Sequence, residues 1–158
     1  MIDIYLRPLI KEDALISYKW RNNSEVWKYT ASKPDRYITK KIETSWIMDV
    51  LRRPDEKRFV ICIKNSNKYI GNVQLTGIKN GKAEFSIFIG ETKYWGKGIA
   101  EKATGLILKY AFNELGLKEV YLRVNKDNIS AIKAYEKNCF CVVDSDGKYF
   151  KMICTPQS

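Results

Sequence analysis

The sequence predicts a single α/β domain over residues 1–158, with a mixed central sheet flanked by helices. Three observations favour this class. Short runs rich in β-branched and aromatic residues alternate with longer amphipathic segments. The pair Asn80-Gly81 lies between two such runs, as in a tight hairpin. A glycine-rich turn around Gly96 joins a predicted strand to the longest predicted helix.

The expected order of elements is β-α-α-β-β-β-α-β-α-β-β. The strands share short apolar or alternating runs bounded by turn residues, and they cover 2–9, 58–63, 69–78, 83–89, 120–124, 139–143 and 149–153. The helices share apolar residues every three or four positions, and they cover 11–22, 38–51, 98–115 and 128–138.

Turn residues set the boundaries of these elements in order. Pro8 ends the first strand, and Asn22-Asn23-Ser24 breaks the first helix, with Ser24 as the expected cap of a short helical turn. Asn65-Ser66-Asn67 forms the next turn, and Gly116 stops the longest helix. Asp146-Gly147 closes the final hairpin.

The glycine-rich turn is suited to binding an anion. The first turn of a helix carries unpaired N–H groups and a partial positive charge, and glycines let a bulky group approach the backbone. A dinucleotide-binding pattern fails because Glu101 stands where a third glycine is needed. A P-loop fails because Gly98, not Ser or Thr, follows Gly96-Lys97. A purely structural turn stays an alternative.

The charge and hydropathy of the chain limit the classes of partner that it can have. The net charge is +10, from 28 Lys and Arg against 18 Asp and Glu, which favours anionic partners. The basic residues are dispersed and form no recognised nucleic-acid motif, so nucleic acid is disfavoured. No run of about 18 apolar residues predicts a membrane span. The early acid Asp3 argues against a secretory signal.

The residue types also limit the chemistry. The chain has no histidine, which excludes Ser-His-Asp and Cys-His catalysis. Its four cysteines contain no Cys-x-x-Cys pair, so no metal site is expected. They are Cys62, Cys139, Cys141 and Cys154, and free thiols in a reducing cytoplasm are the expectation.

Several segments in the right order resemble the GNAT superfamily of acetyl-CoA-dependent N-acetyltransferases. They are Leu6 to Leu9, Trp20-Arg21-Asn22, Ile70-Gly71, Ala83-Glu84-Phe85, Tyr94 to Ala100 and Asn128 to Phe140. The likeness is to the RimJ/RimL-like branch, which includes ribosomal-protein N-terminal, polyamine and bacterial amino-sugar acetyltransferases. It covers nearly the whole chain and implies a GNAT fold with a splayed strand before a pyrophosphate loop.

The resemblance implies where acetyl-CoA binds. Its pyrophosphate loop matches Trp95, Gly96, Lys97, Gly98, Ile99 and Ala100, although Trp95 replaces the usual Gln or Arg. The pantetheine arm is expected to pair with the free backbone of the splayed strand, at Ile87, Phe88 and Ile89. Asn128 is expected near the pantetheine amides, and it is also a good helix N-cap.

The same resemblance implies the catalytic groups of a direct acetyl transfer in a ternary complex. Tyr135 matches the general acid that protonates the departing thiolate, with a packed core tyrosine as the alternative. Cys139 stands where the family has glycine, and Asn138 is expected to take over the helix end. Glu84 is the candidate base, directly or through water, with a purely structural glutamate as the alternative.

The acceptor is expected to be a small-molecule or peptide amine. Trp20, Arg21, Asn22 and Trp46, with Trp27 and Tyr29, are the expected walls of its site. An amino sugar on a nucleotide carrier suits the basic chain, and a protein N-terminus is a further option. A spermidine or other polyamine acceptor is the alternative. An acetyl-CoA-binding sensor and a nucleic-acid-binding module are the non-enzyme alternatives, and a homodimer is left open.

Overall fold

A computed structural model describes residues 2–28 and 33–157. Within that part of the chain, one sheet has the strand order β1-β2-β3-β4-β5-β7-β6. The strands are β1 (Ile4–Pro8), β2 (Lys57–Ile63), β3 (Tyr69–Lys79), β4 (Lys82–Ile89), β5 (Glu119–Asn125), β6 (Cys141–Ser145) and β7 (Tyr149–Cys154). The helices are α1 (Ala14–Arg21), α2 (Ser24–Trp27), α3 (Lys40–Leu51), α4 (Ile99–Asn113) and α5 (Ile129–Glu136). The predicted mixed sheet is confirmed.

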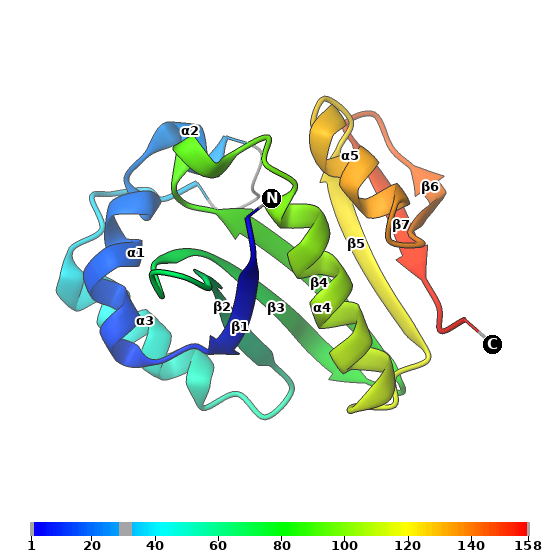
Figure 1. The fold of residues 1–158 in the computed structure, drawn as a ribbon, viewed down its shortest axis with the longest axis horizontal. Coiled ribbons are helices and arrows are strands. Elements are labelled where there is room, and N and C mark those ends of the chain that lie inside the picture. Colours follow the sequence, from blue (N-terminus) through cyan, green and yellow to red (C-terminus); the bar gives the residue numbers. More distant parts are fainter. Residues whose placement is uncertain (1, 29–32, 158) are drawn as a thin grey trace.

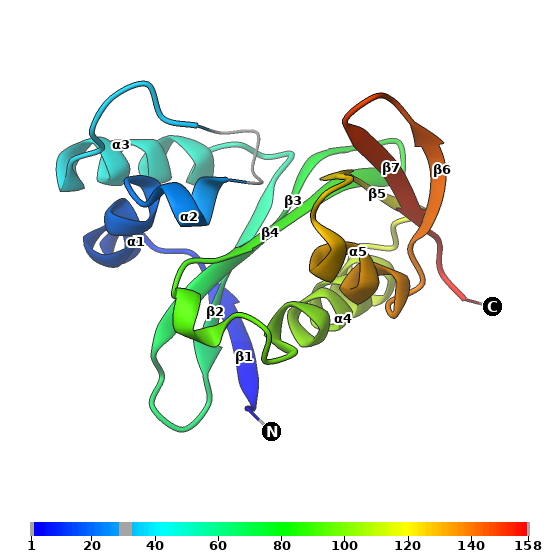
Figure 2. The same ribbon diagram turned by 90° about the horizontal axis from the view of Figure 1, so that it is seen from above.

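The helices lie on both faces of this sheet. Figures 1 and 2 show α4 and α5 against one face, while α1, α2 and α3 gather on the other. The larger core lies under α4, where residues such as Ile107 and Leu122 are almost completely buried. A smaller core lies under α1 and α3 and includes Trp20 and Ile47. Among the described residues, no helix is long and apolar enough to cross a membrane.

Strands β4 and β5 pair over only three positions. They run parallel, and Lys82, Ala83 and Glu84 face Glu119, Val120 and Tyr121. Beyond Glu84, β4 continues to Ile89 while paired only with β3. Figure 1 shows the two strands diverging after this point. The structure therefore contains the splay that the resemblance implied, and from Phe85 onward no strand in the described part of the chain pairs with the β5 side of β4.

Local signals explain most boundaries. Asn80 and Gly81 adopt φ angles of 54° and 77°, as the tight hairpin between β3 and β4 requires. Gly116, at φ 63°, follows the end of α4. The predicted cap at Ser24 was wrong, because the side chain of Asn23 accepts the hydrogen bond from Glu25 N–H. Asn takes this position as readily as Ser.

The first predicted helix begins with a separate 3₁₀ helix, Lys11–Asp13, before α1. Asp13 is buried there, accepts the backbone N–H of Ile10, and forms a bidentate ion pair with Arg7. Because these contacts hold the Asp13 carboxylate to β1 and to the loop before the helix, the first turn of the predicted helix is a tighter 3₁₀ turn.

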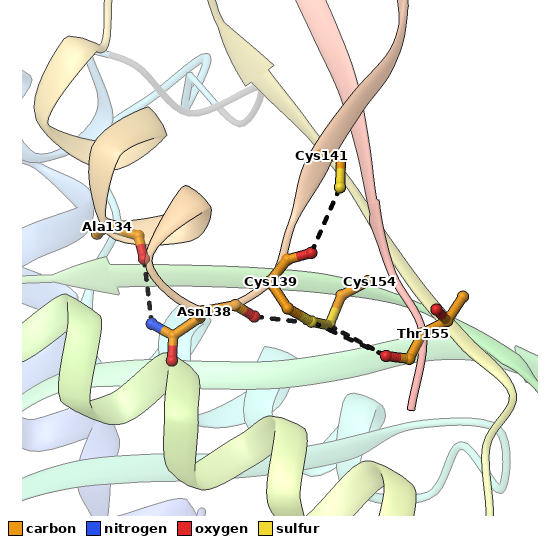
Figure 3. The surroundings of a disulfide bond; sticks show 6 residues. All are labelled: Ala134, Asn138, Cys139, Cys141, Cys154 and Thr155. Carbon is orange, nitrogen blue, oxygen red and sulfur yellow. Dashed lines mark hydrogen bonds between the residues drawn. A yellow bond between two sulfur atoms is a disulfide. The ribbon is translucent and has the colours of Figure 1, made fainter. Parts of the chain in front are cut away.

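Two predictions about cysteine were wrong. Cys139 itself adopts the left-handed conformation, at φ 77°, whereas Asn138 does not. The Asn138 side chain instead donates to the carbonyl oxygens of Glu101 and Ala134. Cys139 and Cys154 are joined by a disulfide bond (Figure 3). Only Cys62, which is buried, and Cys141, which is exposed, are free thiols.

Candidate active site

The turn before α4 is open to a ligand. Gly96 and Gly98 have φ angles of 72° and 76°, and a Cβ atom at either position would meet nothing within 4 Å. Gly98 is the N-cap of α4, and its carbonyl accepts the N–H of Lys102. The amides before Lys102 therefore have no partner along the helix. Unpaired amides beside open space suit a pyrophosphate.

Trp95 ties this turn to the splayed strand. Its indole Nε1 donates to the carbonyl oxygen of Ile89 at 2.9 Å, while its side chain stays 41% exposed. Sequence reasoning missed this contact, because Trp95 was expected to bind the cofactor directly. Lys97 is exposed, Ile99 is buried under the helix, and Ala100 is half-buried.

Two glycines allow neighbouring groups to pack closely against the end of β4. A Cβ atom on Gly71 would lie 2.4 Å from the carbonyl oxygen of Phe88. A Cβ atom on Gly90 would lie 2.0 Å from Cδ2 of Trp20. Trp20 is only 4% exposed, and its ring also meets that of Phe88 with centroids 6.0 Å apart. Trp20 is therefore a core residue that supports the splayed strand, and it was expected to line the acceptor site.

Glu84 and Tyr135 approach the splay from opposite faces of the sheet. Glu84 occupies the last paired position between β4 and β5, opposite Tyr121. Phe85 follows it, so its side chain points to the other face. There its ring lies 5.6 Å from that of Tyr135 on α5. A group held in the splay would thus have a carboxylate on one side and a phenol on the other.

The Tyr135 hydroxyl lies in an apolar setting. The residue is 8% exposed, and its ring also packs edge-on against Phe140, 5.8 Å away. Burial raises the pKa of the Tyr135 hydroxyl above its ordinary value of 10.0. The phenol therefore keeps its proton throughout the physiological range and can donate a hydrogen bond.

Glu84 is half-buried on the opposite face. Among the described residues Glu84 forms no ion pair, and the nearby Glu119 pairs with Lys82. Burial and the negative charges of Glu84 and Glu119 raise the pKa of Tyr121. The neighbouring pair on this face is also polar, since Gln74 Nε2 donates to Ser86 Oγ at 2.6 Å. This face of the sheet therefore offers a carboxylate and a polar floor beside the splay.

Asn128 precedes α5 at its N-cap position. The N-cap position expected for Asn128 is therefore confirmed, but its side chain makes no capping hydrogen bond. The side chain is half-buried and forms no hydrogen bond within the described part of the chain. Its amide remains available to a ligand that reaches the start of α5.

Helices α1 and α3 form a charged wall. Two guanidinium groups lie over the Trp46 ring, those of Arg21 at 5.2 Å and Arg58 at 5.1 Å from its centroid. Arg21 pairs with the buried Glu43 at 2.9 Å, and Arg58 pairs with Glu56 at 2.8 Å. Arg58, in the run Arg58-Phe59-Val60, had supported a polyamine acceptor but was not among the expected walls of the site, although its strand register with Gln74 places it on the Glu84 face.

Asn22 has a structural role at this wall. Its amide group donates to the carbonyl oxygens of Tyr18 and Ile38, and its side-chain oxygen accepts the N–H of Ile38. It therefore fixes the segment that leads into α3. Trp27 lies at the end of α2, and Tyr29 falls outside the described residues. Within the described ranges, no group of three or more Cys, Asp or Glu side chains is placed to hold a metal ion.

Comparison with known proteins decides the family. A family model described as an acetyltransferase (GNAT) domain matches residues 3–140. The chain belongs to the GNAT acetyltransferases. It is therefore an N-acetyltransferase that uses acetyl-CoA, as the glycine turn and the splay had indicated.

Individual relatives agree with this assignment. The spermidine N(1)-acetyltransferase of Escherichia coli K12 is 34% identical over 142 residues, spanning 88% of this chain and 73% of that protein. The acetyltransferase PseH of Campylobacter jejuni strain 81-176 is 27% identical over 150 residues, spanning 95% and 90%. The crystal structure of Vibrio cholerae spermidine N-acetyltransferase with CoA and spermine matches with a TM-score of 0.86 and 25% identity, covering 96% of this chain and 95% of that one.

Proposed function

We propose that this GNAT enzyme transfers an acetyl group directly from acetyl-CoA to a primary amine, within a ternary complex at the β4–β5 splay. The observation that carries the proposal is the combination of unpaired β4 backbone with the open turn at Gly96 and Gly98. The turn amides would bind the pyrophosphate, and Ile87, Phe88 and Ile89 would offer backbone groups to pantetheine. Asn128 would add a side-chain amide.

Residues on the two faces of the sheet then have different roles in the reaction. Acetyl-CoA supplies the acetyl group as a thioester. Glu84 accepts a proton from the attacking amine, directly or through water, because an amine near pKa ~10.4 must first lose its proton. Tyr135 donates a hydrogen bond to the departing sulfur from the opposite face. With its raised pKa the phenol is a weak acid, so we assign it a strong hydrogen bond rather than complete proton transfer.

For the acceptor we propose a polyamine such as spermidine. The support is the relationship to spermidine acetyltransferases, which favours this alternative over the amino sugar or protein N-terminus. Glu84 supplies a carboxylate on this face of the sheet, and that carboxylate can attract an ammonium group.

An amine carried on an anionic group is a second candidate, because one observation favours it. The guanidinium groups of Arg21 and Arg58, each also paired with a glutamate, lie over the Trp46 ring on the same face of the sheet as Glu84. Such groups bind phosphate or carboxylate and repel a polycation. The net charge of +10 acts in the same direction.

An acceptor panel tests these proposals by release of free CoA thiol. It includes spermidine, a nucleotide-linked amino sugar, the same free amino sugar and short peptides. Spermidine is the expected substrate, and a strict preference for the nucleotide-linked sugar would refute it. Arg58→Gln should leave spermidine turnover unchanged or raise it, and should lower the sugar nucleotide's kcat/KM by about tenfold or more if that is the substrate. Lys57→Gln is the matched control, because Lys57 loses the same charge while facing away.

A further inference from the structure

Three cysteines meet at the C-terminal end of α5. The disulfide joins Cys139, three residues beyond the helix, to Cys154 at the end of β7, with Cα atoms 5.5 Å apart. Cys141 is exposed, and its sulfur lies 3.7 Å from the carbonyl oxygen of Cys139. Figure 3 shows the three side chains on adjoining segments. None of them is among the residues that we propose for the acetyl transfer.

The two sulfur atoms of the bond differ in access. Cys154 is 1% exposed, whereas Cys139 is half-exposed. Cys139 and Cys141 line a surface pocket of about 320 Å³, together with Thr155. A small thiol in this pocket meets the sulfur of Cys139 first. Cys154 is then the leaving group, and its sulfur lies 3.5 Å from the carbonyl oxygen of Asn138, which can accept a hydrogen bond from the Cys154 thiol once that thiol is protonated.

The bond fixes the segment that follows the proposed acid. Phe140 N–H donates to the carbonyl oxygen of Tyr135 at 3.1 Å, and the two rings pack together. Cys139, between them, has φ 77°, a conformation that costs a side-chain-bearing residue stability. At the other end of the bond, Cys154 is paired with Val120 of β5. The cross-link thus ties the segment that follows α5 to the end of β7, and β7 pairs with β5, the strand that borders the splay.

We propose that Cys139–Cys154 is a thiol–disulfide exchange site for low-molecular-weight thiols, and that the state of this bond sets the position of Tyr135. The second half of this inference rests on the proposed catalytic role of Tyr135; the first half does not.

The exchange balances in two steps. One thiolate attacks the Cys139 sulfur, forms a mixed disulfide with it and releases the Cys154 thiolate, which takes up a proton. A second thiolate attacks the outer sulfur of the mixed disulfide and releases Cys139. Two small thiols are oxidised to their disulfide while the protein gains two thiols. The reverse sequence, with the small disulfide as oxidant, restores the bond.

Thiol counting in the Cys141→Ser variant tests the first half directly. Cys62 is completely buried, so the oxidised variant should expose no reactive thiol under native conditions. After incubation with excess glutathione, Cys139 and Cys154 should become titratable. If Cys139 still reacts as a free thiol after the protein has been prepared with glutathione disulfide, the bond has not formed, and this result would overturn the proposal. A bond that resists millimolar glutathione and millimolar CoA would overturn it as well.

The experiment is run separately with glutathione and with CoA. Both are small thiols, and CoA is also the product of acetyl transfer. Reduction by either thiol supports the exchange site. Reduction by CoA alone would make the reaction's own product the reductant. The desulfo analogue of CoA is the control, because it has no thiol and should leave the bond intact.

Melting temperature reports the structural effect without any substrate. The bond spans 15 residues, and for a chain of this size its loss should lower the melting temperature by about 6–12 °C. Cys154→Ser should show this loss under all conditions. Cys139→Gly should lose less, because glycine tolerates the positive φ that Cys139 adopts. Equal melting temperatures for oxidised and reduced Cys141→Ser would overturn the inference.

Kinetics test the link to Tyr135. Reduction of Cys141→Ser should lower kcat severalfold and leave KM for acetyl-CoA nearly unchanged. Both Cys154→Ser and Cys139→Gly should be insensitive to thiols. If reduction lowers the melting temperature but leaves kcat unchanged, the link to Tyr135 is wrong. Absence of turnover in the untreated wild type would instead count against the proposed function, and the thiol counts would still decide the exchange site.

Discussion

Replacing Gly98 by alanine separates backbone strain from loss of the pyrophosphate site. Gly98 and Gly116 lie at opposite ends of α4, both at positive φ and both with open space around the absent Cβ. Alanine costs about 1–2 kcal/mol in this conformation, which lowers the melting temperature by about 2–8 °C in a protein of this size. Gly98→Ala and Gly116→Ala should therefore lose similar stability without ligand.

The two variants should differ once acetyl-CoA is added. At 100 times its dissociation constant, a ligand stabilises the native state by about 2.7 kcal/mol, or about 5–11 °C. Gly116→Ala should keep this shift. In Gly98→Ala the methyl group enters the space proposed for the pyrophosphate. If binding weakens 100-fold, the same concentration stabilises by only about 0.4 kcal/mol.

Differential scanning fluorimetry with and without acetyl-CoA measures both effects. Gly98→Asp adds a negative charge at the same point and should remove the remaining shift, although aspartate is itself a good N-cap. Equal ligand-induced shifts in the wild type, Gly98→Ala and Gly116→Ala would refute the assignment of this turn to the pyrophosphate.

Four further changes address the remaining parts of the site. Tyr135→Phe should keep acetyl-CoA binding and stability but lower kcat by about 100-fold, because it removes the hydrogen bond to the departing sulfur; a larger loss is not expected, since a thiolate near pKa ~8.5 is already a fair leaving group. Steady-state kinetics measure this, and an unchanged kcat would return Tyr135 to the core. Glu84→Gln should preserve the ligand-induced melting shift and lower turnover most near neutral pH, and a wild-type pH–rate profile would assign the basic step to water. Trp95→Phe should raise KM for acetyl-CoA more than it lowers kcat, because it removes the hydrogen bond to Ile89 while the ring still packs. An unchanged KM would show that this hydrogen bond does not hold the turn in place for acetyl-CoA. Burial raises the pKa of Tyr69 and Tyr135 in the folded state, so the stability they contribute should be complete below about pH 10 and fall as pH rises further; denaturant titrations that show no loss above about pH 10 would contradict this.

Local sequence signals predicted the elements that surround the site. The Asn80-Gly81 hairpin, the start of α4 after Gly98 and its end before Gly116 all follow from residues that favour positive φ. The splay between β4 and β5 came from the family resemblance, since no local pattern marks where two strands separate. It depends on the register with β5, which begins more than 30 residues after β4 begins.

Other features depended on contacts between distant segments. Trp20 looked like a site residue because it lies beside Arg21, but Gly90 leaves room for its ring in the core. The pairing of Cys139 with Cys154 follows from the antiparallel pairing of β6 with β7, in which Cys141 faces Ile153, and spacing alone does not predict it. The glycine expected at position 139 was a signal that this position needs a positive φ, and Cys139 adopts it.

Analysis of both products of a single reaction tests the central claim most directly. The enzyme, acetyl-CoA and spermidine are mixed, and released CoA thiol, N-acetylspermidine and the intact mass of the protein are followed over time. Direct transfer predicts one acetylated amine for each thiol released, with no acetyl group on the protein at any time. An acetylated enzyme that forms before the product, or thiol release that no amine accelerates, would contradict transfer within a ternary complex at the β4–β5 splay.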